Sequence, residues 1–248
     1  MTSRLAVHQL RYELRAFART PQAVFFVFAL PLVMLAVFAE INDGFEVASF
    51  GGRSFTAFFV PGMLVFGMVS ATYGNLSART VLRRESGQLK RLRATPLPAA
   101  SYLAGAIANA TLVAAAVAAA VLALGRFGYG VALPHRWWLA AALFLLAAAC
   151  FSALGLALST LVGRPEAADP AVFATMLPVV FISGVFQVVP DGSVLARVAG
   201  AFPVRPTLDA LRAVYLDAPI RPGHLAVIVA WGAAGALVAA RRFRWAPS

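Results

Sequence analysis

The amino-acid sequence contains six long apolar runs, and this repetition constrains the fold more than any other feature. Each run has about 17 to 26 residues, and a helix of about 20 residues crosses the hydrocarbon core of a bilayer. The chain is 61% hydrophobic and 12% charged, whereas soluble domains average about 45–50% apolar and about 25% charged. The sequence therefore predicts an all-α membrane protein with six spans, at residues 22–39, 55–76, 101–124, 137–162, 171–189 and 224–240.

Residues 1–20 precede the first span and form an amphipathic pattern. Val7, Leu10, Leu14 and Phe17 recur at helical spacing, which predicts a helix lying among the lipid headgroups. A cleaved presequence is the alternative, but the following run has span length and no clear small-x-small cleavage site. We therefore expect a retained interfacial helix with a second, basic face formed by Arg4, Arg11, Arg15 and Arg19.

The distribution of basic residues predicts the orientation of the spans. With six spans both termini lie on one side, and that side then holds 14 Lys and Arg residues against seven on the other. Basic residues favour the cytoplasmic side of a membrane, so both termini are predicted to be cytoplasmic. The scarcity of Lys and the many Arg and Ala residues suggest a bacterial cytoplasmic (inner) membrane.

Residues 190–223 are predicted to lie on the outer side and are less apolar than the spans. They contain two short helical patterns, separated by Pro203 and Pro206, and neither is long enough to cross a membrane. Backbone that dips into a membrane without crossing it must be covered by protein or by a water-filled cavity. We expect an outer re-entrant helical hairpin before the last span.

Residues 77–100 carry six cationic side chains, which lipid excludes, and so form a cytoplasmic segment. Glu85 falls within an apolar helical face, which suggests that this face packs against a partner that offers a donor. In the alternative, Ser86-Gly87 ends the helix and Glu85 pairs locally with Arg or Lys. The other members of the apolar face are Val81, Leu82, Leu89 and Leu92.

The sequence lacks the residue patterns of several chemistries. Lys90 is the only lysine and has no phosphate-binding Gly-rich loop before it, so we expect no ATP site in this chain. His8, His135 and His224 are scattered, and no metal site, catalytic residue or bound cofactor is predicted. Net charge is +11, but apolar runs separate the charges, which argues against nucleic acid as a partner. Because the chain is expected to have no ATP site of its own, any energy it uses must come from outside the chain.

Two motifs resemble those of ABC-2-type transporter permeases, particularly the branch related to daunorubicin-resistance exporters. The first resembles the family pattern R-E-x-G-T-L-x-x-L-R-A-T-P-L, with Gln88 at a usually small polar position. It comprises Arg84, Glu85, Gly87, Leu89, Lys90, Arg91, Leu92, Arg93, Ala94, Thr95, Pro96 and Leu97. The second comprises Phe181, Ile182, Ser183, Gly184, Val185 and Phe186, followed by Pro203 and by Asp209 to Arg212.

The resemblance implies one transmembrane domain over residues 1–248, which dimerises with an identical or different permease subunit. Two separate ABC ATPase subunits would bind ATP and Mg and dock on a coupling helix in residues 77–100. The resemblance assigns this coupling to the first motif, from Arg84 to Pro96. It assigns the pore or outer gate to Phe181, Ser183, Gly184, Phe186 and Phe202.

The expected function is export of a hydrophobic or amphiphilic substrate, such as a drug, lipid or glycan, including antibiotic efflux. The chain itself would not be an enzyme. Two alternatives remain open: a six-span membrane enzyme acting on lipid, and a membrane assembly protein without transport activity. The first would need buried acid, base or metal-binding groups, and the second would not need the coupling motif.

Overall fold

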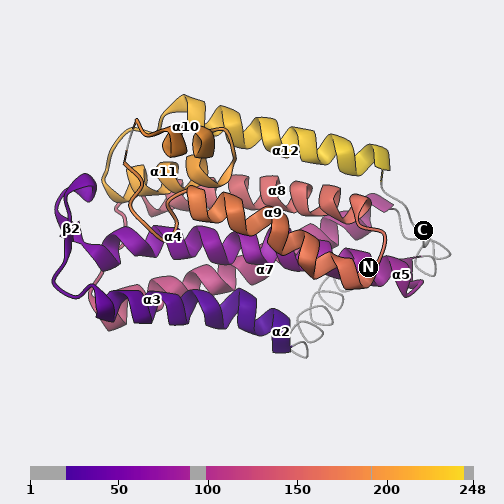
Figure 1. Cartoon of the computed structure of the whole chain (residues 1–248), viewed down its shortest axis with the longest axis horizontal. Helices are drawn as coiled ribbons and strands as arrows, with labels where there is room; N and C mark the ends of the chain where they lie inside the picture. The colour runs from indigo at the N-terminus through magenta and orange to yellow at the C-terminus, as the bar shows by residue number, and fades with distance from the viewer. Residues whose placement is uncertain (1–20, 90–98, 191, 243–248) are drawn as a thin grey trace.

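The computed structural model describes residues 21–89, 99–190 and 192–242, most of which lie in helices. The long helices run roughly along one axis and form an elongated bundle (Figure 1). We call its two ends the basic end, where helix α5 stops, and the ribbon end, where a short β-ribbon lies. The interfacial helix predicted over residues 1–20 lies outside the described residues.

The centre of the bundle is one continuous helix over Phe55–Glu85. It consists of α4 (Phe55–Val69), the π-helical segment η3 (Ser70–Asn75) and α5 (Leu76–Glu85). The 18-residue apolar window of this helix is entirely buried inside the structure, whereas the corresponding windows of the other spans are 17–44% buried. The second apolar run is therefore the core of the bundle, and the other runs cover it.

Among the residues that the structure describes, five helices are long and apolar enough to cross a membrane, judged by length and composition. Besides the central helix they are the helices that contain α7, α8, α9 and α12. A shorter apolar helix, Phe25–Ile41, occupies the place of the first predicted span. The bounds are α7 Ala99–Ala123, η4 Leu124–Gly128, α8 Trp137–Leu161, η5 Pro165–Ala167, α9 Ala168–Ile182 and α12 Pro222–Arg242.

The first helix contains a π-helical segment directly before its proline. Its parts are α2 (Pro21–Val24), η1 (Phe25–Ala29) and α3 (Leu30–Ile41). Because Pro31 has no N–H, it cannot donate to the carbonyl four residues earlier. The N–H of Leu30 bonds to Phe25 O, five residues back, so the helix widens where that ladder is interrupted.

Two helices end at other residues than the predicted spans. The second span, predicted to end at residue 76, continues as helix to Glu85, so the segment predicted as a loop from residue 77 begins inside the central helix. The fifth span, predicted over residues 171–189, is helical over Ala168–Ile182 and then turns at Gly184, whose φ is +80°. The central helix continues through polar and basic residues beyond its apolar run, whereas the fifth apolar run continues beyond the end of its helix, so helix ends and hydropathy do not coincide.

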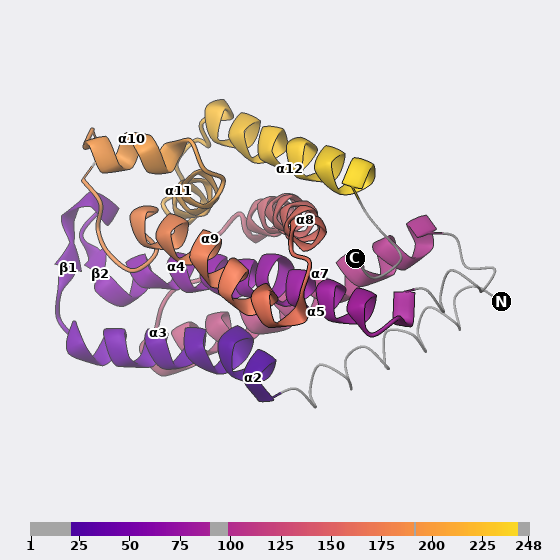
Figure 2. The same cartoon turned by 45° about the vertical axis from the view of Figure 1, so that its right-hand side comes forward.

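The ribbon end contains the loop between the first two long helices and the segment that precedes the last helix, α12 (Figure 2). The loop forms an antiparallel ribbon, a small departure from the predicted all-α fold. Residues 190–223 contain the two expected short helices: α10 has exposed apolar side chains, and α11 is mostly buried. The bounds are β1 Glu46–Val47, η2 Ala48–Phe50, β2 Arg53–Ser54, α10 Val194–Gly200 and α11 Val204–Tyr215.

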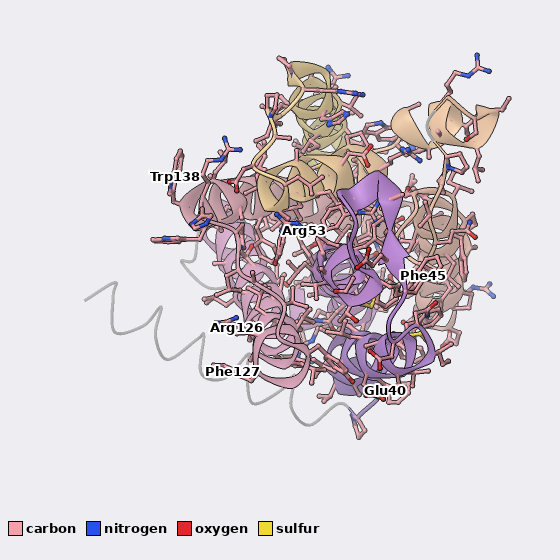
Figure 3. All side chains as sticks on the ribbon, turned by 90° about the vertical axis from the view of Figure 1, so that its left-hand side faces the viewer. Glu40, Phe45, Arg53, Arg126, Phe127 and Trp138 are labelled. Carbon is pink, nitrogen blue, oxygen red and sulfur yellow. The ribbon has the colours of Figure 1, made fainter. Side chains whose placement is uncertain are left out.

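Aromatic and charged side chains are exposed together around the ribbon end. Figure 3 shows Arg126, Phe127 and Trp138 on one side of this end and Phe45 by the ribbon. Trp137 and Trp138 are exposed at the start of α8, and Trp residues are enriched at membrane–water interfaces. This position fits a membrane–water boundary near the start of α8.

Candidate functional site

Arg84, in the last turn of α5, connects the basic ends of α5 and α8. Its buried guanidinium donates through Nη1 to Ser159 O at 2.8 Å and through Nη2 to Val162 O. The last four carbonyls of a helix have no partner within that helix, and α8 ends at Leu161. Arg84 therefore caps α8 from the side and fixes the end of α5 to it.

The neighbouring carboxylate completes this arrangement. Arg84 Nε donates to Glu85 Oε1 at 2.9 Å. The helix ends at Glu85, and Gly87 adopts a φ of +72°, which glycine accepts more easily than other residues. Both features of the alternative stated above, a helix break at Ser86-Gly87 and a local ion pair of Glu85, are confirmed.

The apolar face predicted for partner docking is not one surface. Val81 is buried against Val162 and Ala168, and Leu89 is fully buried, so both contribute to packing within the chain. Leu82 is 57% exposed and points elsewhere. The sequence pattern failed here because it assumed one helix through residues 79–93, whereas the structure ends the helix at Glu85.

The turn between α8 and α9, residues 163–170, adjoins the end of α5. Contacts of α5 with η5 and α9, together with the Arg84 bonds, place this turn beside the end of α5, where Leu82 is exposed. Arg164, Glu166 and Asp169 are exposed there. Sequence analysis did not assign this turn to the site; its three charges within six residues are the only signal. We define the α5-end surface as Leu82, Ser86, Gln88, Arg164, Glu166 and Asp169.

The remaining predicted coupling and interfacial residues cannot be placed. They lie outside the described residues and comprise Lys90, Arg91, Leu92, Arg93, Thr95 and Pro96 of the first motif, and Arg4, Arg11, Arg15 and Arg19 of the N-terminal segment.

The turn after α9 lies against the central helix and is held by Arg212 of α11. Arg212 Nη2 donates to Gly184 O at 3.0 Å, and its guanidinium carbon lies 3.8 Å from the centre of the Phe58 ring. A Cβ at Gly62 would approach Val185 O to 2.5 Å, closer than a side chain tolerates. Glycine at position 62 therefore permits the close approach of this turn to α4.

The predicted outer-gate residues divide into two groups. Phe181 and Phe186 pack with ring centroids 5.1 Å apart, and Phe186 also packs against Phe66 of the central helix at 5.3 Å. Phe202 instead stacks on Trp231 of α12 at 5.8 Å. Ser183 is buried, and its hydroxyl donates to Val179 O, so it stabilises the end of α9. Phe181, which is 53% exposed, is the accessible member of the first group.

Among the residues described, no three His, Cys, Asp or Glu side chains come together as a metal ion would require. The arrangement is that of a multi-pass helical membrane protein with one buried central helix and a charged surface at one end. The family model for ABC-2 type transporter matches residues 7–216, and the chain belongs to this family. No match was found among curated proteins. The chain is thus a membrane-spanning permease component of an ABC transporter.

Proposed function

We propose that the chain is the permease subunit of an ABC exporter in the bacterial cytoplasmic membrane, with both termini cytoplasmic. It pairs with a second permease subunit and with two ATPase subunits, which bind ATP and Mg. The cargo is hydrophobic or amphiphilic, because charges in the described spans occur only near their ends, which leaves no ionised group at mid-depth for a polar solute or a coupling ion.

One observation carries this proposal: the α5-end surface and the outer turn contact the same helix. Phe55–Glu85 has 31 residues, about 46 Å at 1.5 Å per residue. Its basic end is fixed to α8 by Arg84, and near its other end Gly62 lies against the turn at Val185. A displacement of the α5 end by an ATPase would therefore be transmitted directly to the outer turn.

The π-helical segment lies between these two contacts. The helix is π-helical over Ser70–Asn75, and this segment packs closely against α8. A Cβ added at Gly155 of α8 would lie 2.9 Å from Thr72 O and 2.8 Å from Tyr73 O. Tyr73 Oη lies 2.6 Å from Thr175 Oγ1 of α9, and this pair is exposed. The segment therefore lies between the two contacts and itself packs against α8 and α9.

The proposed outer gate consists of Phe181 and Phe186 against Phe66. Phe181 and Phe186 flank the turn that Arg212 holds, so a shift of the central helix changes their packing. Phe202 belongs to the contact of α12 with the end of α10 and is not proposed as part of this gate.

The docking proposal is tested with the full chain, co-expressed with a candidate ABC ATPase. Leu82→Glu should weaken co-purification of the ATPase about tenfold or more, a loss of about 1.4 kcal/mol of association free energy. Phe127→Glu is the matched control, because Phe127 is 89% exposed at the opposite end. Equal ATPase recovery with both variants, at equal membrane insertion, would contradict the proposed surface.

A further inference from the structure

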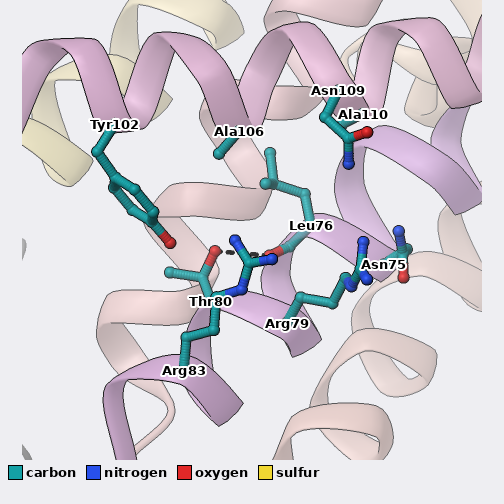
Figure 4. A pocket seen from close by; sticks show the side chains of 9 residues that line it. All are labelled: Asn75, Leu76, Arg79, Thr80, Arg83, Tyr102, Ala106, Asn109 and Ala110. Carbon is teal, nitrogen blue, oxygen red and sulfur yellow. Dashed lines mark hydrogen bonds between the residues drawn. The ribbon is translucent and has the colours of Figure 1, made fainter. Parts of the chain in front are cut away.

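A small pocket lies between the central helix and α7, and residues of η3, α5 and α7 line it (Figure 4). The space open to the centre of a water-sized sphere is about 10 Å³. On this measure a cavity needs about 10–15 Å³ to hold one water molecule. The pocket is therefore far too small for a lipid or a cargo molecule and has the size of a single water.

Several polar side chains that line the pocket are engaged in other interactions. Arg79, Arg83 and Tyr102 each have interactions of their own. Thr80 Oγ1 donates to Leu76 O at 2.7 Å, within α5, and so has spent its only hydrogen. These side chains form walls that need no occupant, and the group that remains to be explained lies deeper in α7.

The amide of Asn109 is an independent sign that the pocket has an occupant. Asn109 is 5% exposed, and its Oδ1 has no hydrogen-bond partner within the described part of the chain. A buried oxygen without a donor is costly, because it has lost its bonds to water and gained none in return. Figure 4 shows this amide projecting from α7 toward α5. Buried polar groups of this kind are often satisfied by an ordered water.

A second amide, that of Asn75, lines the same pocket from the central helix. Measured along the helices at 1.5 Å per residue, Asn75 lies about 15 Å from the end of α5, and Asn109 about 15 Å from the start of α7. The two amides therefore lie at matching depths, away from the water-facing end of this helix pair. Lipid offers no hydrogen-bond partner at such depths, so a polar group needs a neighbouring helix or a water.

We propose that the pocket binds one water molecule, which joins α7 to the central helix. The water donates a hydrogen bond to Asn109 Oδ1 and uses its remaining capacity for the side-chain amide of Asn75. An amide offers both donors and acceptors, and water is the smallest molecule that can serve either. None of the lining residues is acidic, so the pocket offers no carboxylate to a cation of similar size.

The water bridge lies where the central helix changes its geometry. Asn75 is the last residue of the π-helical segment η3, and α5 begins at Leu76. Ordered waters and neighbouring helices stabilise irregular backbone of this kind inside a membrane. The bridge therefore holds the start of α5 against α7. The inference does not rest on the proposed function, because it concerns the internal structure of the subunit and not its cargo or its partners.

The test is water-edited solid-state NMR of the full chain in liposomes, which detects the transfer of magnetisation from water protons to nearby amides. Asparagine is a suitable label, because the sequence contains only Asn42, Asn75 and Asn109. Asn42 is half-buried at the ribbon end, where its Nδ2 donates to Phe38 O at 2.9 Å, and it serves as the reference. We expect transfer to the side-chain amides of Asn75 and Asn109 as well.

Two variants remove the proposed water in different ways. Ala106 lines the pocket, so Ala106→Val fills it and should abolish transfer to both Asn75 and Asn109. Asn109→Leu removes one amide and should abolish transfer to Asn75. Ala108→Val is the matched control, because Ala108 is exposed on α7 outside the pocket, and it should leave transfer to both amides unchanged. Should one of the two variants fail to insert, the other decides.

Three results would overturn the proposal. The first is the absence of transfer to Asn109 in the unmodified chain while Asn42 responds, which would mean that the pocket is dry. The second is undiminished transfer to Asn109 in Ala106→Val, which would mean that water reaches this amide from elsewhere. The third is undiminished transfer to Asn75 in Asn109→Leu, which would mean that the two amides do not share a water.

Discussion

At the scale of single residues, Arg84 shows how one side chain of a recognisable motif can serve the fold. The motif suggests contact with a partner, but the guanidinium is buried and engages Glu85, Ser159 O and Val162 O. Bidentate and charge-assisted bonds of this kind suit arginine and not lysine. A role of Arg84 in coupling is therefore indirect: it keeps the end of α5 in place.

Replacing Arg84 should lower the stability of the whole bundle. Arg84→Gln leaves two helix-end carbonyls without their donor, and we expect the free energy of unfolding to fall by about 2 kcal/mol. The free energy of unfolding of Arg84→Lys should lie between those of the unmodified chain and Arg84→Gln, since an ammonium group cannot reach both carbonyls in the same geometry. The measurement is denaturant or thermal unfolding of the purified chain in detergent.

Arg242→Gln serves as the control, because Arg242 is exposed at the end of α12 and its loss should change stability by less than about 0.5 kcal/mol. The same decrease in both variants would mean that the Arg84 contacts do not hold the two helices together.

At the scale of elements, the packing of α4 against the outer turn depends on the absence of a side chain at Gly62. Gly62→Ala places Cβ within 2.5 Å of Val185 O, so backbone must move. We expect a loss of about 1–3 kcal/mol from overpacking, seen as a lower unfolding midpoint.

Gly105 of α7 provides the comparison within the same chain. A Cβ there meets nothing within 4 Å, and alanine is the better helix former by up to about 1 kcal/mol. Gly105→Ala should therefore leave stability unchanged or raise it. If the two alanine variants shift the midpoint in the same direction by the same amount, the close contact at Gly62 is not maintained in the membrane protein.

At the scale of the whole molecule, the basic residues near one end predict the orientation of the bundle. We expect the α5-end surface in the cytoplasm and the ribbon end outside. Gln88 and His135 are exposed and represent the two ends, while the native Cys150 is buried and can be replaced by Ser.

The test is labelling with a membrane-impermeant maleimide in the Cys150→Ser background. His135→Cys should be labelled on intact cells, and Gln88→Cys only after the membrane is opened. The opposite pattern would place the basic end outside and would exclude a cytoplasmic ATPase as the partner of the α5-end surface.

Much of the helix arrangement could be predicted from the sequence, because lipid requires long apolar helices whatever they pack against. The predicted fourth span, residues 137–162, and the helix α8, Trp137–Leu161, agree within one residue. The predicted two short helices between the fifth and sixth spans are present as α10 and α11. The α5-end surface was less predictable, since it depends on where one helix ends and which turn lies beside it.

The sequence by itself determined that the chain is a multi-pass helical membrane protein of the ABC-2 type, since span length, basic flanks and motif are local properties. The tertiary structure alone decided which apolar run is central and that Arg84 and Leu89 face inward while Leu82 faces out. It also brought residues 163–170 beside α5 and Asn109 opposite Asn75. The physical reason is that burial within the bundle and exposure to lipid both favour apolar side chains, so hydropathy cannot distinguish them.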